Sequence, residues 1–166
     1  MSRDIRSIAN FLLDEADRRG LAITNMALNK ILYFAQGWYL ATKKRELFLQ
    51  DFEAWEMGPV SPVIYQQFKS AGSNPIKDRA KTINLHSGSQ EASEYSLSRE
   101  EEGHLIRMLE FYGHRSAAVL SHMSHEQGAP WDMVRNSDGY LGMKIPNGLI
   151  KAFFESKLTK KFGGDA

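Results

Sequence analysis

The strongest constraint on the fold of this chain is a predicted helix that is apolar on almost every side. Residues 24–43 place large apolar side chains at helical spacing, and aromatic, alanine and glycine residues fill the remaining faces. Because a helix that is apolar all round is buried by its neighbours, we expect this segment to be the central helix of the domain. Lys30 and Gln36 are its polar exceptions, and buried polar groups need partners. We expect Lys30 to extend to the surface and Gln36 to bond a nearby loop.

Helical periodicity and capping signals predict the elements that surround this helix. The expected helices cover residues 2–19, 62–71, 98–113 and 116–124, a short turn at 130–131, and a last helix from 146. An extended aromatic segment, 46–57, and two short strands, 83–85 and 95–97, are expected to supply the β structure, the two strands as a hairpin. The fold class predicted is mainly α, a compact single domain of six to seven helices with a small β element. The domain is expected to span 1–158, followed by a polar flexible tail, 159–166.

Composition narrows the class of protein. At 166 residues, 42% of them hydrophobic, the chain has the length and composition of one globular domain. It has no cysteine, which excludes disulfides and thiolate metal sites. No apolar run approaches the roughly 20 residues that span a membrane. The net charge of +1 gives no general argument for nucleic-acid binding. We therefore expect a cytoplasmic protein that binds neither membrane nor nucleic acid.

Residues 53–65 concentrate backbone restraints in one short stretch. Gly58 can take a positive φ, and Pro59 and Pro62 each fix φ near −65°. Ser61 has the chemistry of an N-cap, with Pro62 as the first helical residue. The stretch therefore predicts a rigid Gly-Pro turn that leads into a helix. Because it also carries Trp and Tyr, it is either a structural pivot or a binding surface.

Motifs for catalysis are missing from the sequence. It has no Gly-rich phosphate loop, no H-E-x-x-H and no G-x-S-x-G. His122 and His125 are three residues apart beside Glu126, a spacing that a metal site could use. The alternative is that His125 is hydrogen-bonded beside the turn that precedes Trp131. We expect no catalytic residue, no metal and no cofactor.

Four segments resemble the motifs of the Panacea domain family, which includes the SocA-like antitoxins. They are residues 26–38 (MALNKILYFAQGW), 53–65 (EAWEMGPVSPVIY), 120–131 (LSHMSHEQGAPW) and 144–154 (KIPNGLIKAFF). They follow the family's order over about residues 5–158. The departures are conservative: Ile31 replaces the commoner Leu, and Ser124 the Thr that is common before the histidine.

The resemblance implies an antitoxin that neutralises a cognate toxin by direct binding. Family members are typically encoded beside the toxin gene, often in phages and mobile islands. The SocA type instead delivers its toxin to the ClpXP protease as a proteolytic adaptor, which is the alternative. A remote alternative is a small enzyme built on Lys30, Glu53 and His125, which would have to converge in one cleft.

The motif residues are the candidates for the partner-binding site. They are Lys30, Tyr33, Gln36, Glu53, Trp55, Tyr65, His125 and Trp131, with Gly58, Pro59 and Pro62 as the structural turn. Some of them, Trp55 and Trp131 included, could equally serve packing alone. Since members of the family bind unrelated toxins, the specific contacts are expected in variable parts, residues 73–94 and the exposed helix faces.

Overall fold

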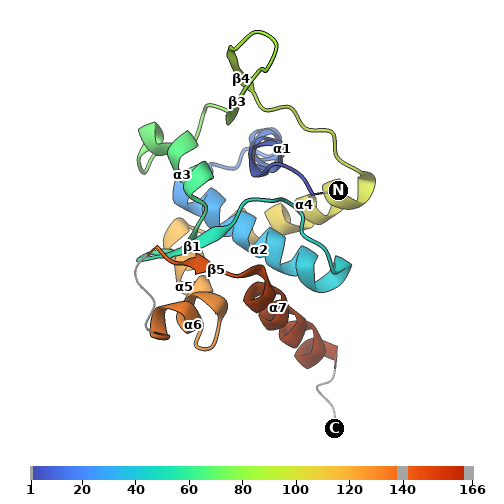
Figure 1. The fold of residues 1–166 in the computed structure, drawn as a ribbon, viewed down its shortest axis with the longest axis vertical. Coiled ribbons are helices and arrows are strands. Elements are labelled where there is room, and N and C mark those ends of the chain that lie inside the picture. The colour runs from blue at the N-terminus through green and yellow to red at the C-terminus, as the bar shows by residue number, and fades with distance from the viewer. Residues whose placement is uncertain (1, 138–141, 163–166) are drawn as a thin grey trace.

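Helix α2 (Asn25–Lys43) is the centre of the structure, as predicted. The computed structural model describes residues 2–137 and 142–162. In it α2 runs through the middle of the molecule and packs chiefly against α7 (Asn147–Phe162), α5 (Ala117–Ser124) and α4 (Arg99–Tyr112) (Figure 1). The approach of α7 explains why Gly37 lies in α2, since a Cβ on Gly37 would overlap the ring of Phe154.

The remaining helical segments pack against these helices or against one another. They are α1 (Ile5–Arg18), α3 (Pro62–Gln67), the single 3-10 turn η1 (Lys69–Ala71) and α6 (Pro130–Asn136). The part of the chain that the structure describes thus holds seven α-helices, which confirms the mainly α prediction. The predicted caps are also confirmed: Ser61 accepts a bond from the N–H of Ile64, and Ser98 forms a capping box with Glu101.

A small antiparallel sheet lies beside the central helix. Its strands are β1 (Phe52–Trp55), β2 (Gly58–Val60) and β5 (Lys144–Ile145), in the order β2-β1-β5. Trp55 pairs with Gly58, so the turn of the hairpin is Glu56-Met57. The predicted position of the turn was therefore wrong: Gly58 has the positive φ expected of it, 113°, but it and Pro59 already belong to β2. Pro62 does begin α3.

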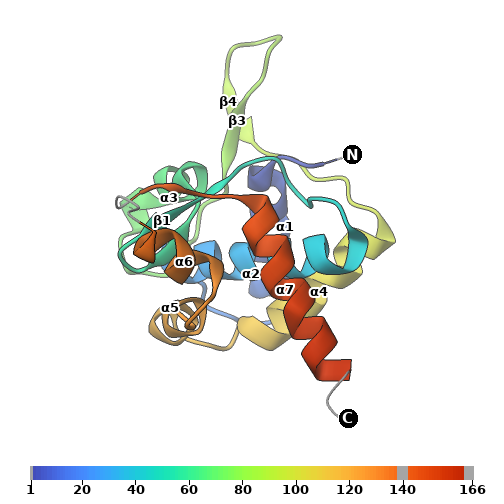
Figure 2. The same cartoon turned by 60° about the horizontal axis from the view of Figure 1, so that its bottom comes forward.

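A second hairpin projects from the body (Figures 1 and 2). It pairs β3 (Lys81–Ile83) with β4 (Gln90–Ala92). The prediction of a strand at 95–97 was wrong, because Tyr95 is used for tertiary packing. Its ring lies edge-on to Phe11 at 5.3 Å, and its hydroxyl donates to Asp14 at 2.7 Å. Leu85, predicted to end a strand, lies near the tip with 95% of its surface exposed.

The C-terminal helix is longer than the sequence pattern indicated. Helix α7 continues to Phe162, past the predicted domain end at residue 158. The rest of the predicted tail, residues 163–166, lies outside the described residues. None of the described helices combines the length and the apolar character needed to cross a membrane.

Candidate functional site

Lys30 is buried, and its ammonium donates a hydrogen bond to the carbonyl oxygen of Pro59 at 3.0 Å. The expectation that it extends to the surface was therefore wrong. The side chain ends beneath the β1–β2 hairpin, where Gly58 covers it. Burial disfavours the charged amine and lowers the pKa of Lys30 to about 7.

Two asparagines of α2, which the sequence patterns did not single out, extend this anchor. The side-chain oxygen of Asn29 accepts a bond from the backbone N–H of Ser61 at 2.8 Å. Its amide donates to Asn25, and Asn25 donates in turn to the carbonyl of Tyr65 at 3.1 Å. Both asparagines are buried, in a helix whose other buried residues are apolar except for Lys30 and Gln36. That contrast was the available signal, because buried amides need fixed partners.

Gly58 is the point where the hairpin meets α2 and α5. A Cβ on this residue would lie 2.6 Å from Oγ of Ser124, 2.8 Å from Cε of Lys30 and 3.3 Å from Nε2 of His125. Its φ of 113° is also one that other residues rarely adopt. Both the space and the backbone conformation therefore require glycine here.

His125 and Trp131 support the same hairpin from the side of α5 and α6. Their rings stack at 3.9 Å, and Nε1 of Trp131 donates to the carbonyl of Trp55 at 2.7 Å. Burial, with a smaller contribution from the charge of Lys30, lowers the pKa of His125. Its Nε2 is buried without a partner among the described residues. The described residues also contain no group of three or more side chains that could hold a metal.

Tyr33 and Gln36 belong to the core. Gln36 donates to the carbonyl of Phe48 at 2.9 Å and accepts from the N–H of Leu47 at 2.8 Å, so the predicted bond to a nearby loop is confirmed. The Tyr33 ring lies edge-on to Phe52 at 5.6 Å, and burial raises the pKa of its hydroxyl. Like Lys30, these two residues are buried, so a partner cannot reach them in this conformation.

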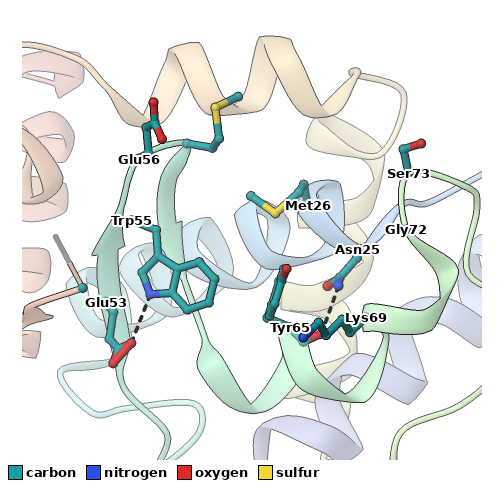
Figure 3. Close-up of a pocket in the computed structure, with 11 residues that line it drawn as sticks. Asn25, Met26, Glu53, Trp55, Glu56, Tyr65, Lys69, Gly72 and Ser73 are labelled. Carbon is teal, nitrogen blue, oxygen red and sulfur yellow. Dashed lines mark hydrogen bonds between the residues drawn. The ribbon is translucent and has the colours of Figure 1, made fainter.

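Glu53, Trp55 and Tyr65, by contrast, open onto one groove of about 740 Å³ (Figure 3). Nε1 of Trp55 donates to Oε2 of Glu53 at 3.0 Å, which fixes the indole. The rings of Trp55 and Tyr65 lie 4.8 Å apart at 62°. The structure therefore brings together three of the candidate residues on an accessible surface.

Other parts of the groove come from segments that sequence reasoning did not connect. Its remaining lining is contributed by Asn25, Met26, Glu56, Met57, Lys69, Gly72, Ser73 and Gly142. Figure 3 shows Met26 of α2 beside Tyr65, with Glu56 at the far end of β1. No local pattern links these segments, because only the folded chain places α2, the β1–β2 hairpin and the end of η1 side by side.

The fold and the groove define a mainly helical domain in which buried motif residues hold the groove of Trp55 and Tyr65 in place. The family model described as "Antitoxin SocA-like, Panacea domain" matches residues 28–132. The chain is 40% identical over 158 residues to Antitoxin SocA of Caulobacter vibrioides (strain NA1000 / CB15N), covering 92% of this chain and 83% of that protein. No solved structure matches it. The chain belongs to the SocA-like, Panacea-domain antitoxin family.

Proposed function

We propose that this protein is an antitoxin that neutralises a cognate toxin by binding it directly, and that the groove of Glu53, Trp55 and Tyr65 is part of the interface. The observation that carries the proposal is the 40% identity to an antitoxin across 92% of the chain. The toxin is expected to be the product of the adjacent gene.

The chemistry of the groove supports this role. Tryptophan and tyrosine are enriched among the residues that dominate binding energy at protein interfaces. The backbone of both residues is held by hydrogen bonds. Trp131 donates to the carbonyl of Trp55, and Asn25 donates to the carbonyl of Tyr65. A surface that is ordered before binding loses less conformational entropy when its partner arrives. The half-exposed Met57 adds apolar area that can adapt to the partner.

Co-expression tests the proposal. The neighbouring gene is induced alone, with this protein, and with the Trp55→Ala, Tyr65→Ala double variant. We expect growth arrest by the toxin alone, rescue by the wild-type protein with a co-purifying complex, and loss of rescue with the double variant. A toxic neighbour that this protein neither binds nor counteracts would refute the proposal.

The second candidate is a ClpXP adaptor, the alternative that the resemblance to SocA-like antitoxins implies. The relative named Antitoxin SocA matches this chain over 83% of its own length. An adaptor needs the same toxin contact and a further contact with the protease. It predicts that the toxin's half-life depends on both this protein and ClpXP. Toxin turnover that is the same in wild-type and protease-deficient strains would exclude the adaptor role and leave direct neutralisation as the proposed mechanism.

The enzyme alternative has little support. Glu53 lines the groove, whereas His125 lines a different cavity together with Phe153 and Lys157. Lys30 is buried beneath Gly58, where a substrate has no access in this conformation. Acid–base catalysis needs such groups within hydrogen-bond reach of one substrate.

A further inference from the structure

We propose that the groove receives an arginine side chain of the toxin, with the guanidinium at the carboxylate of Glu53 and the aliphatic stem along Trp55. This inference rests on the proposed function and specifies what the partner presents to the groove.

The first argument is charge complementarity. Neither Glu53 nor Glu56 forms an ion pair within the described residues, although many other acids of the chain do, including Glu100, Glu101 and Glu155. Glu53 uses Oε2 to accept the Trp55 bond, and Oε1 has no partner among the residues that the structure describes. Figure 3 shows the two side chains at opposite ends of β1, so a cation at Trp55 that reaches the Glu53 carboxylate does not also contact Glu56. The Glu53 carboxylate is therefore a preformed acceptor for a cationic donor.

The second argument is the aromatic surface beside these acids. A cation placed over an indole or phenol ring is attracted by the negative face of the ring. The bond from Trp55 to Glu53 keeps the ring and a carboxylate in fixed relation, with 3.0 Å between nitrogen and oxygen. A side chain that is planar, cationic and able to bond two oxygens at once uses both features. Arginine has this combination, whereas lysine carries a single point charge.

The third argument places the cation within the groove. Lys69 lines the groove from the side of η1 and Tyr65 (Figure 3). Its positive charge disfavours a second cation there and directs the guanidinium toward Glu53. The neighbouring part of the partner then faces Met26 and Met57, which suit an apolar side chain next to the arginine.

Charge-neutral variants test the inference in the complex of the full chain with the co-expressed toxin. Glu53→Gln keeps an oxygen that can accept the Trp55 bond and removes only the charge. The matched control is Asp51→Asn, a carboxylate whose side chain is 43% exposed and which lies outside both the groove lining and residues 73–94. We expect Glu53→Gln to weaken toxin binding about tenfold or more and to reduce its salt dependence, because charged hydrogen bonds are lost.

Cross-linking identifies what occupies the groove. A photo-reactive p-benzoylphenylalanine in place of Met57, which is 55% exposed, is activated in the complex and the joined toxin peptide is sequenced. We expect a peptide with an arginine, whose replacement by glutamate abolishes binding to the wild-type protein and is rescued by Glu53→Lys. A joined peptide without a basic residue, or a Glu53→Gln variant that binds as the control does, would overturn the inference alone. Absence of any complex would overturn the proposed function and this inference with it.

Discussion

Lys30 donates its hydrogen bond to the carbonyl of Pro59 from a fully buried position, 3.0 Å away. This contact joins the central helix to strand β2, and the bond from Ser61 to Asn29 joins the same helix to the start of α3. The corner that carries Trp55 and Tyr65 is therefore anchored by fully buried residues. Lys30 and Asn29 of the α2 motif thus hold the residues of the groove in position.

Stability should depend on pH through Lys30. The folded-state pKa of about 7 lies below the ordinary 10.5, so the unfolded chain binds more protons between these values and stability rises with pH across that window. Lys30→Met removes this contribution. The stability of the wild type relative to Lys30→Met should rise between pH 7 and pH 10, by at most about 4 kcal/mol. Urea denaturation at several pH values measures it, and a difference that is constant with pH would contradict the burial of Lys30.

Gly58→Ala should destabilise the protein strongly. The new methyl group would lie 2.6 Å from Oγ of Ser124 in addition to the backbone strain at a φ of 113°. We expect a loss of about 2–4 kcal/mol in the free energy of unfolding. Gly88→Ala is the control: its φ of 70° is also positive, but nothing lies within 4 Å. It should cost about 1 kcal/mol. Equal losses for the two variants would refute the close approach at Gly58.

Trp131→Phe should weaken toxin binding indirectly. It removes the 2.7 Å bond to the Trp55 carbonyl and should cost about 1 kcal/mol of stability. The control is Trp38→Phe, which removes a 2.9 Å bond to Tyr112 far from the groove lining. Both variants should lose similar stability, and the dissociation constant should rise only for Trp131→Phe. A rise of the same size for Trp38→Phe would show that lost stability, not the position of Trp55, governs binding.

The projecting hairpin should contribute to toxin specificity. Leu85 is 95% exposed, so Leu85→Ser should change the free energy of unfolding by no more than about 0.5 kcal/mol. We expect the same variant to weaken toxin binding, since an apolar side chain near the hairpin tip would be buried in the interface. Leu49→Ser, with 59% exposure outside the hairpin, serves as the control. An unchanged affinity of Leu85→Ser for the toxin would contradict the expectation that residues 73–94 contact the toxin through the hairpin tip.

Local chemistry made much of the fold predictable. The capping box of Ser98 and Glu101 and the Ser61-Pro62 helix start depend only on neighbouring residues, and both appear as expected. The strand at 95–97 was mispredicted because the packing of Tyr95 on Phe11 is a tertiary contact that local propensity does not contain.

The site was predictable only in part, for a similar reason. Motifs indicated Glu53, Trp55 and Tyr65, which do meet in one groove. The burial of Lys30 depends on how closely β2 and α5 approach α2, and a sequence pattern does not contain that distance. Met26 and Ser73 join the groove from segments far apart in the chain, so no spacing rule would have grouped them.

The dissociation constant of the complex between this protein and the product of the adjacent gene, compared for the wild type and Tyr65→Ala, tests the central claim most directly. The substitution removes the Tyr65 ring, which is one aromatic wall of the groove. It leaves the hydrogen bond that Asn25 donates to the backbone carbonyl of residue 65. We predict that the folded variant binds at least about tenfold more weakly. An unchanged dissociation constant in a variant with wild-type stability would contradict the claim that this groove binds the toxin.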